Sequence, residues 1–554
     1  MKQIISALIH DALVEAKKLN NLAIDLPVLI PLDRPQVASH GDFASSLALK
    51  LAKPLKMNPL VIANHIAEHM SSNDVIEHIW VQPPGFLNLT IKPTWLAQYV
   101  DNILAEASNY GNVPIGMGES VQIEFVSVNP TGPIHVGHTR GAVLGDALAN
   151  ILRAANYKVT KEYYFNDAGN QMETFYKSLH VRYQQVLGKT ITMPDNSYAG
   201  NYMIELAEDI VSEEGERFML MDPDQGLYNL GQVGLKKILD NIQRDLNTLR
   251  VEFDTWFKEH TLYEDGQYDK AMAILGKGGH LQIRDGATWF VTSALGEDKD
   301  NVLVRSTGVP TYFAADVAYH YNKFAERNFS KVINIWGADH HGHISRMKAA
   351  LTAMDIEPER LTVITNQMIT LKSGNQILRA SKRTGDIITL MELLDEVGAD
   401  ACRYFFLARS PESHLEFDLD LAKKESSENP VYYIQYAHAR ISSILRHAEA
   451  NDLNYLQGDV LLLTHPAELS LINKMTMFPD LIESMAINLE PHHLPHYAQD
   501  LASSFHTFYQ QCRVVSTTPD DAPVTYARIK LVKACQVVLG RCLSMMGMVA
   551  PNHM

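Results

Sequence analysis

Two histidines three residues apart, His135 and His138, follow a predicted strand in the segment NPTGPIHVGH and lead directly into a predicted helix. At the carboxyl end of a parallel strand, the unpaired backbone N–H groups and the dipole of the next helix attract phosphate groups. Two imidazoles at this position can both donate hydrogen bonds to phosphate oxygens as negative charge builds up. Gly137 between them leaves room for a flat base or a ribose. In the alternative interpretation both histidines only cap the helix, and the HVGH pattern by itself leaves both interpretations open.

A second set of phosphate-binding groups lies far downstream, in the segment LRASKRTGD at 378–386. Lys382 lies between Ser381 and Arg383, which together form a dense set of donors for a polyphosphate. Gly385 provides a hinge for a mobile loop. Basic surface loops are common, so this segment indicates little without the first one.

Carboxylates and a tyrosine form a third candidate group. Glu124 lies on the predicted strand that precedes Asn129, and Asp316 lies one helical turn after Tyr312 if that segment is helical. Carboxylates are the natural partners of a guanidinium, which presents a planar fork of N–H donors and often pairs through two hydrogen bonds. The alternative is that these carboxylates pair with a protein arginine such as Arg140.

The segment ADHHGH contains the one cluster that suggests a metal, namely Asp339, His340, His341 and His343. Consecutive histidines point in different directions on a strand end or a helix, whereas a zinc site needs spaced ligands held by further partners. We therefore expect no metal site here.

The elements that must position these residues follow a strand and helix alternation. Strands are predicted at 121–128, 158–165, 331–336 and 361–365. A long helix after the first strand has a buried stripe that we predict to consist of Val143, Leu144, Ala147, Leu148, Ile151 and Leu152. The interval 166–301 is mostly helical in pattern and interrupts the sheet, and from Glu412 onward the pattern is helical. The fold class is therefore α/β, with a doubly wound parallel (Rossmann-like) sheet that carries an insertion.

The flanking regions predict two further domains. An amphipathic helix opens the chain, a short strand is predicted at 86–91, and the glycine-rich segment 110–118 is typical of a linker. The predicted organisation is a small α+β domain at 1–112, the Rossmann-like domain with its insertion at 113–411, and an all-α helical bundle at 412–554.

Composition indicates a globular protein of several domains. The chain has 554 residues, of which 46% are hydrophobic and 20% are charged, and only four are cysteines. At ~150 residues per domain this length gives three or four domains, and so few cysteines favour a reducing, cytoplasmic compartment. No apolar run is long enough for a membrane span.

The net charge of −16 argues against a nucleic-acid partner, but the charge is unevenly distributed. After Asp521 no acidic residue occurs, and four cations remain: Arg528, Lys530, Lys533 and Arg541. Taken alone, this cluster is typical of a solvated helix face.

Together and in this order, HVGH and RASKR resemble the two signature sequences of class I aminoacyl-tRNA synthetases. Further segments resemble the arginyl-tRNA synthetase family within that class, namely IEFVSVNPTGPIHVGHTRGAVLGDALANILRAANYKVTKEYYFNDAGNQ, TYFAADVAYH, INIWGADHHGH, GADACRYFF and NPVYYIQYAHARI. The second signature of the class is ideally Lys-Met-Ser-Lys-Ser. Here Arg379 and Ala380 replace its first two residues, while Lys382 matches its second lysine.

This resemblance implies an enzyme that attaches L-arginine to its cognate tRNA. ATP, with Mg²⁺, first forms arginyl-adenylate, and the arginyl group then passes to the terminal adenosine of the tRNA. The N-terminal domain would contact the tRNA elbow, and the helical bundle would bind the anticodon.

The resemblance also assigns roles to residues. Catalytic roles fall to His135, His138 and Lys382. ATP contacts fall to these three and to Gly137, Asp339, His340 and Ser381. Glu124, Tyr312 and Asp316 would hold the substrate guanidinium, and Asn129 its amino or carboxylate end. The late basic cluster becomes a predicted tRNA contact.

Two other classes of function remain open from the sequence. A small-molecule nucleotidyltransferase also uses an HxGH turn, although it has no use for a large helical C-terminal domain. A catalytically silent tRNA-binding relative is supported only by the departure of RASKR from the usual signature.

Overall fold

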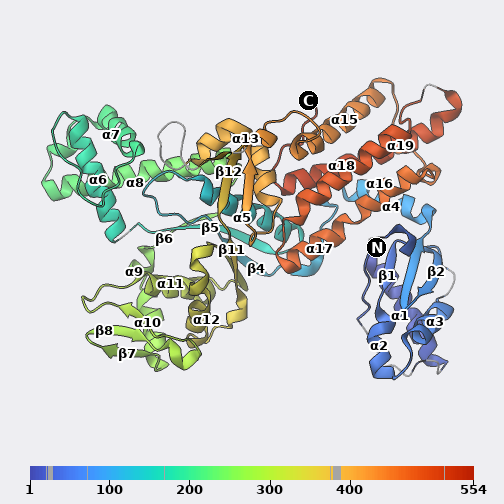
Figure 1. Ribbon diagram of the computed structural model, residues 1–554, viewed down its shortest axis with the longest axis horizontal. Helices are drawn as coiled ribbons and strands as arrows, with labels where there is room; N and C mark the ends of the chain where they lie inside the picture. Colours follow the sequence, from blue (N-terminus) through green and yellow to red (C-terminus); the bar gives the residue numbers. More distant parts are fainter. Residues whose placement is uncertain are drawn as a thin grey trace.

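The computed structural model of the chain describes residues 1–554 apart from 20–21, 23–28, 36, 71–72, 168, 375, 379–387 and 517. Figure 1 shows a small α+β domain at one end, a central sheet with its covering helices, and a bundle of long C-terminal helices between them.

The N-terminal domain is built on a three-stranded antiparallel sheet of order β1-β3-β2, covered by three helices. Its elements are α1 (Lys2–Lys18), β1 (Phe43–Ser45), α2 (Leu47–Leu55), α3 (Pro59–His69), β2 (Ile76–Gln82) and β3 (Phe86–Ile91). Helix α1 buries Ile5, Ile9 and Leu13 along one face, which confirms the predicted amphipathic helix. The predicted strand at 86–91 is also confirmed.

Helix α4 (Pro93–Glu106) leads from this domain to the centre of the molecule and packs against the C-terminal helices. The N-terminal domain contacts the bundle directly through Arg34, whose guanidinium lies 3.5 Å from the Asp480 carboxylate and donates to Asn473 at 2.8 Å.

The central sheet has five parallel strands in the order β11-β10-β4-β5-β6. The strands are β4 (Ser120–Glu124), β5 (Lys158–Phe165), β6 (Thr255–Lys258), β10 (Lys331–Gly337) and β11 (Leu361–Asn366). Four of them occupy the predicted positions, and the fold class predicted from the sequence is confirmed. The edge strand β6 was missed, because it is short and lies inside the mostly helical interval.

Helices cover both faces of this sheet, as strand alternation requires. Ile333 and Ile335 of β10 share a buried cluster with α5 (Val136–Ala154), whereas Val332 joins a second cluster on the opposite face. That second cluster contains α10 (Gln267–Lys277), α11 (Tyr312–Tyr321) and α12 (Ile344–Ala353). The predicted helix over 347–354 is confirmed with slightly earlier bounds.

The first strand is shorter than predicted. Strand β4 ends at Glu124 instead of Val128, because Val126 and Ser127 adopt positive φ angles of 66° and 45°. This backbone region is unfavourable for a β-branched residue such as valine, so the surrounding structure must stabilise it. The turn holds the chain away from the sheet just before the predicted phosphate-binding residues.

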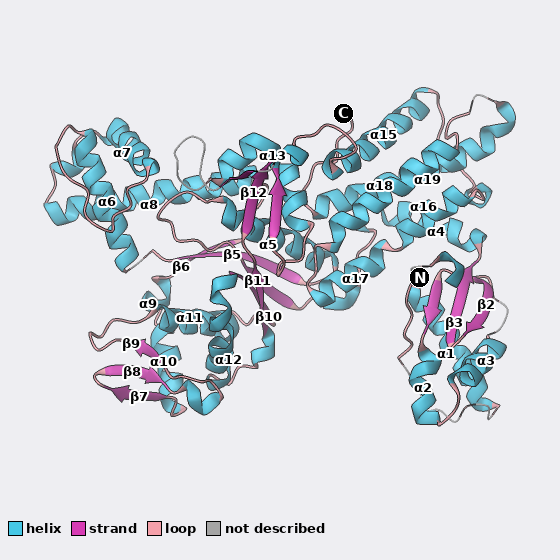
Figure 2. Cartoon of the chain, in the orientation of Figure 1, coloured by secondary structure: helices cyan, strands magenta, loops and turns pink. Residues whose placement is uncertain are grey.

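The interval between β5 and β9 forms two separate units (Figure 2). Helices α6 (Asn170–Val186), α7 (Asn201–Glu214) and α8 (Pro223–Thr248) form a helical insertion. A short antiparallel sheet of order β7-β8-β9 follows, with α9 (Thr261–Glu264) nearby; its strands are β7 (Leu281–Arg284), β8 (Ala287–Phe290) and β9 (Asn301–Val304).

After β11, a small mixed sheet and a helix lead to the C-terminal region. The elements are β12 (Ile369–Ser373), β13 (Gln376–Leu378), α13 (Leu390–Leu407), β14 (Leu415–Asp418) and α14 (Leu419–Ala422). Strand β12 pairs with β13 antiparallel and with β14 in parallel.

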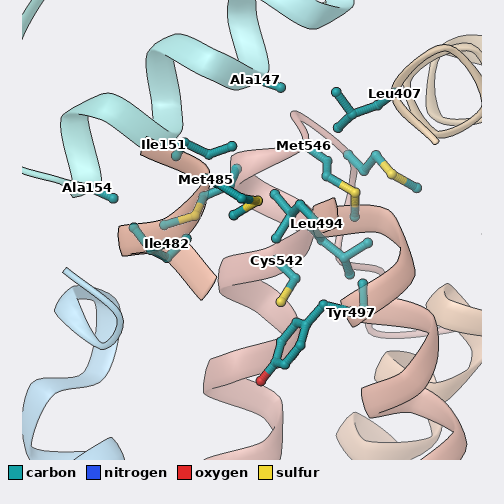
Figure 3. Packing of buried hydrophobic residues seen from close by; sticks show 14 of the residues in the cluster. Ala147, Ile151, Ala154, Leu407, Ile482, Met485, Leu494, Tyr497, Cys542 and Met546 are labelled. Atoms are coloured by element: carbon teal, nitrogen blue, oxygen red, sulfur yellow. The ribbon is translucent and has the colours of Figure 1, made fainter. Parts of the chain in front are cut away.

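The C-terminal region contains the long helices α15 (Pro430–Ala450), α16 (Pro466–Thr476), α17 (Phe478–Asn488), α18 (His493–Gln511) and α19 (Ala522–Met545). Their core is continuous with α5 of the sheet region (Figure 3). Ile151 and Ala154 of α5 lie beside Met485 and Ile482 of α17, and all four side chains are buried. The C-terminal part of the helix that begins at HVGH therefore packs against the bundle.

The residues after α19 form a seam with the sheet region, in which their backbone groups pair with side chains of earlier elements. The contacts join Asn150 Nδ2 to the Met545 carbonyl at 3.2 Å, Arg403 to the Met546 carbonyl, Arg250 Nη1 to the Gly547 carbonyl at 2.9 Å, and the Val549 amide to Asp400 Oδ1 at 3.1 Å. Arg403 is fully buried and also pairs with Asp146 of α5, which accepts from Lys161 at 2.9 Å. We call residues 545–549 and these four partners the C-terminal seam.

Candidate active site

The backbone joins the first candidate segment to the residues just after the second. The Val136 amide donates to the Ile388 carbonyl at 3.0 Å, and the Leu390 amide donates to the Ile134 carbonyl at 2.8 Å. Two segments far apart in the sequence therefore lie side by side at the carboxyl edge of the sheet. Ser381 and Lys382 lie outside the described residues, so their predicted contacts stay predictions.

His135 caps helix α5 and is held in a defined tautomer. Its Nδ1 accepts a hydrogen bond from the Gly137 amide at 3.2 Å, so the ring proton of the neutral imidazole is on Nε2. Burial lowers the pKa of His135. The residue therefore combines both interpretations of the sequence: one nitrogen caps the helix, and the other is left as a donor.

His138 lies against His135, with 3.6 Å between the ring centroids. Burial lowers the pKa of His138 to about 3, with a smaller contribution from His135. Its Nδ1 is buried and has no hydrogen-bond partner among the residues that the structure describes. Both rings are therefore uncharged at neutral pH and can act as hydrogen-bond donors rather than as cations.

The fold itself requires a glycine at position 137. A Cβ atom built at this position would lie 3.0 Å from the imidazole of His135. The glycine therefore makes room for the capping ring, and its predicted approach to a nucleotide stays a prediction.

The turn between β4 and α5 is held by hydrogen bonds from its neighbours. Tyr163 donates to the Val128 carbonyl at 2.9 Å, and Tyr202 of α7 donates to the Thr131 carbonyl at 2.7 Å. Asn129 donates to Gln171 at 2.5 Å, so its amide is fixed by the first turn of α6.

Glu124 ends β4 in a buried ion pair. Lys323 is fully buried and donates to Glu124 Oε2 at 2.5 Å and to Asn334 at 2.9 Å. The protein partner of Glu124 is therefore a lysine and not Arg140, which instead donates to four backbone carbonyls. The sequence offered no signal for Lys323, because the contact joins segments far apart in the chain.

Asp316 lies on α11 as predicted, one turn after Tyr312, whose side chain is exposed. Asp316 accepts from His343 Nε2 at 2.8 Å, and His343 Nδ1 in turn accepts from Arg346 at 2.5 Å. One carboxylate oxygen is therefore oriented by a chain of two side chains. The second carboxylate oxygen of Asp316, Oδ1, takes no part in the hydrogen bond with His343.

A third carboxylate that the sequence did not indicate lies close to these two. Glu259 follows β6 and accepts from the hydroxyl of Tyr164 at 2.7 Å. Burial raises the pKa of Glu259 to about 7, with smaller effects from Tyr164 and Asp316. Burial, followed by the charges of Glu259, Asp316 and Glu124, holds the pKa of Tyr164 well above its ordinary value. Glu124, Asp316 and Glu259 thus form a group of neighbouring carboxylates, which we call the acidic pocket, and carboxylates are the partners that a guanidinium requires.

The predicted histidine cluster does not form one ligand set among the side chains that the structure describes. Asp339 and His340 are exposed and lie 3.9 Å apart, whereas His343 faces Asp316. The side chain of His341 lies outside the described part of the chain.

The late basic cluster makes internal contacts. Arg528 pairs with the buried Glu468 at 2.6 Å, and Lys530 pairs with Asp101 at 2.5 Å. Lys533 donates to Gln536, and Arg541 donates to Asn112 and the Tyr110 carbonyl. These contacts stabilise the bundle, and a contact with tRNA stays a prediction for these four residues.

A separate cavity in the bundle was missed by the sequence analysis. It measures about 660 Å³ and is lined by Arg440, His447, Tyr509 and Arg513, among others. The Arg440 guanidinium lies over the Tyr509 ring, 4.8 Å from its centroid. The Tyr509 side chain is half-buried, and an aromatic ring beside cations is a feature of sites that stack a nucleotide base.

A parallel sheet has HVGH at its carboxyl edge, paired with residues 388–390 downstream of the second signature, and a helical bundle follows. This combination defines a class I aminoacyl-tRNA synthetase. Family models agree over most of the chain: "tRNA synthetases class I (R), catalytic domain" matches residues 99–407, "DALR anticodon binding domain" matches 434–554, and "Arginyl tRNA synthetase N terminal domain" matches 2–91. The chain belongs to the arginyl-tRNA synthetase family.

Individual relatives are similar over the full length. The arginine–tRNA ligase of Dehalococcoides mccartyi strain BAV1 is 52% identical over 554 residues, which is 100% of this chain and 99% of that one. The arginine–tRNA ligase of Carboxydothermus hydrogenoformans is 47% identical, with 94% of each chain covered. The structure of Thermus thermophilus arginyl-tRNA synthetase has the same fold, with a TM-score of 0.77 at 22% identity and 100% of both chains covered.

None of the helices in the described part of the chain is both long and apolar enough to cross a bilayer.

Proposed function

We propose that the acidic pocket and the HVGH turn together perform the two steps of arginine–tRNA ligation, and that the residues described above have specific roles in it. The enzyme uses ATP to form arginyl-adenylate and then transfers the arginyl group to the terminal adenosine of tRNA. The observation that carries the residue assignment is the backbone pairing of residues 134–136 with 388–390. This pairing supports a single nucleotide site to which both signatures contribute.

The substrate guanidinium binds among Asp316, Glu124 and Glu259. Lys323 already neutralises one oxygen of Glu124, so Asp316 and Glu259 supply most of the unpaired negative charge. Tyr312, exposed at the start of α11, and Asn129 would orient the substrate from the entrance of the pocket. A lysine side chain lacks the planar fork, so it pairs less well with several carboxylates at once.

Activation needs no protein nucleophile. The arginine carboxylate attacks the α-phosphorus of ATP, and pyrophosphate leaves with its electrons. His135 Nε2–H and His138 donate to phosphate oxygens that gain charge, and the positive end of α5 adds to this stabilisation. We assign the same task to Lys382 and contacts with ATP to Gly137, His340 and Ser381.

Mg²⁺ would accompany the triphosphate. The Asp339 carboxylate is 84% exposed, and an open carboxylate of this kind is what Mg²⁺ accepts beside phosphate oxygens. When bound, the ion would neutralise phosphate charge, and the positioning of the reactants would rest on the side chains named above.

The remaining domains would bind tRNA. The N-terminal domain, predicted at 1–112, is assigned to the tRNA elbow, and the bundle at 412–554 to the anticodon stem and loop. The cavity beside Arg440 and Tyr509 supports a place for an anticodon base, because stacking and positive charge favour any unpaired base. Four free, buried cysteines support a reducing compartment such as the cytoplasm.

Pyrophosphate exchange tests this function. We expect exchange that depends on arginine, is absent when lysine replaces arginine, and is measured both with and without tRNA. Charging of the tRNA with labelled arginine completes the test. Exchange that ignores the identity of the amino acid would contradict the pocket assignment. Tight tRNA binding without pyrophosphate exchange or tRNA charging would instead indicate a tRNA-binding relative that lacks catalytic activity.

A further inference from the structure

The short connection between α17 and α18 gathers an unusual set of side chains. Helix α17 ends where Leu489 takes a left-handed conformation, and the sequence EPHH then runs from Glu490 to His493, the first residue of α18. One ligand atom from each of Glu490, His492 and His493 lies within 4.8 Å of the others. Within the described ranges, no other group of three histidine, cysteine, aspartate or glutamate side chains is gathered this closely.

The spacing of two of these side chains matches the coordination sphere of a transition metal. The Glu490 Oε2 and His493 Nε2 atoms are 3.4 Å apart. Zinc holds nitrogen and oxygen ligands at about 2.0–2.2 Å, which places two ligands of a tetrahedral site about 3.3–3.6 Å apart. The ring centroids of His492 and His493 are 4.2 Å apart, and one ligand atom of His492 lies within 4.8 Å of those of the other two residues.

One of these imidazoles has an unused nitrogen. The Nδ1 atom of His492 is buried and has no hydrogen-bond partner in the described part of the chain. Leaving a buried polar atom unpaired costs free energy, and a bound ligand would remove that cost.

The N-terminal end of a helix repels cations, and this effect weighs against the site. Glu490 supplies a full negative charge next to the histidines, which outweighs the partial charge of the helix end. The His493 and Glu490 side chains are 48% and 45% exposed, so an ion can enter directly from solvent and water can complete its coordination.

We propose that Glu490, His492 and His493 form a binding site for one divalent transition-metal ion, with Zn²⁺ as the best fit to two imidazoles and one carboxylate. This site is distinct from the histidine cluster considered in the sequence, and no residue of the acidic pocket or of the HVGH turn takes part in it.

The ion would fix the junction between the bundle and the sheet region. Leu494, the next residue, is fully buried in the core shared with α5 (Figure 3). His496, three residues after His493, pairs through Nε2 with the carbonyl of Ala408 just after α13, at 2.9 Å. A metal at 490–493 therefore braces the first turn of the helix that makes both contacts.

The test uses the full-length chain without a polyhistidine tag, dialysed free of metal and titrated calorimetrically with Zn²⁺ alone. We expect the wild type to bind one equivalent that a His492→Ala/His493→Ala variant binds at least about tenfold more weakly. A Glu490→Gln variant, which keeps the shape of the turn, should bind with intermediate affinity. Equal binding by the wild type and the double variant would overturn the proposal.

The chain offers a matched control. His65 and Glu68 of α3 are separated by the same 3.4 Å, but the described structure contains no third ligand grouped with them. A His65→Ala variant should still bind one equivalent of Zn²⁺ with the wild-type affinity. If this variant no longer binds that equivalent, the ion belongs to α3 instead.

Two further measurements separate binding from misfolding. Co²⁺ bound to the wild type should give the strong visible absorption of a four-coordinate ion, and this band should be missing from the double variant. Zn²⁺ should raise the thermal midpoint of the wild type but not that of the double variant, while metal-free circular dichroism spectra agree. If the metal-free double variant does not have the circular dichroism spectrum of the wild type, the Glu490→Gln variant takes its place in the titration. A Zn²⁺ affinity of Glu490→Gln equal to that of the wild type would then overturn the proposal.

Discussion

At the residue scale, the two histidines of the HVGH turn are neutral, and this fixes how they can act. Each can stabilise phosphate only by donating a hydrogen bond, because burial lowers both pKa values. Loss of one such donor typically costs about 3 kcal/mol, or ~100-fold in rate. We expect the rate of arginine-dependent pyrophosphate exchange to fall by this ~100-fold factor in His138→Ala and by a similar factor in His135→Ala. Wild-type exchange in both variants would contradict the assignment.

Asp316 provides the sharpest test of substrate choice. An Asp316→Asn side chain can still accept from His343 but cannot pair fully with a guanidinium, so the fold should be kept and arginine use lost. Truncating one partner of a buried charged pair costs ~2–5 kcal/mol, which should lower kcat/KM for arginine while ATP binding persists. Tyr312→Phe should cost less, about 0.5–1.5 kcal/mol. Near-normal arginine use by Asp316→Asn would place the pocket elsewhere.

Glu259 should make arginine binding depend on pH. Its pKa is raised to about 7, so the carboxyl is neutral below that pH and charged above it, whereas the guanidinium stays charged throughout. We therefore expect KM for arginine to rise as pH falls from 8 to 6, by up to about tenfold per unit below 7. Steady-state pyrophosphate exchange by Glu259→Gln should give a higher KM for arginine that does not change between pH 8 and 6. An identical pH profile in both proteins would exclude Glu259 from the pocket.

At the element scale, the C-terminal seam makes α5 and α13 depend on the bundle. Arg403 is fully buried between Asp146 and backbone carbonyls of two other segments. Removing one partner from a buried charged network costs ~3–5 kcal/mol. Here Lys161 still pairs with Asp146, but one Asp146 oxygen and three backbone carbonyls lose their buried donor. We expect Arg403→Met to lower the free energy of unfolding by that amount in urea. The exposed pair of Arg153 and Asp254 is the matched control, and Arg153→Met should cost less than about 1 kcal/mol.

Regular elements were predictable where a periodic pattern exists. The stripe from Val143 to Leu152 placed α5 correctly, and apolar runs placed β5, β10 and β11. The early end of β4 was not predictable, because Val126 takes its unfavourable conformation only in the folded surroundings.

The site was predictable in part. The HVGH turn and the shared helix of Tyr312 and Asp316 follow from local spacing. Lys323, His343 and Glu259 acquire their roles through contacts between distant segments, which leave no periodic trace in a single sequence. Charge counting alone likewise could not reveal that Arg528 and Lys530 have internal acidic partners.

At the scale of the whole molecule, binding of tRNA should depend on the cavity in the bundle more than on the late basic cluster. Arg440→Gln should raise KM for tRNA and reduce the salt dependence of tRNA binding, because one cation is lost from the interface. Tyr509→Ala should weaken binding by about 1–3 kcal/mol through lost stacking. Filter binding over a range of salt concentrations measures both effects. The control is Lys533→Gln, outside the cavity, and a larger effect there would favour the late cluster.

The C-terminal seam also bears on the order in which the chain is made. Arg403 and Asp400 emerge from the ribosome well before residues 546–549, which supply their carbonyl and amide partners. Domains usually begin to fold during synthesis, N-terminal regions first. In this chain the buried arginine has Asp146 and the carbonyls of Leu249 and Arg250 available early, but it lacks its Met546 partner until α19 has been completed. A ribosome-bound fragment that stops short of residue 546 should therefore have an incomplete seam, so α5 and α13 gain their full set of contacts only after the helices of the bundle have been made.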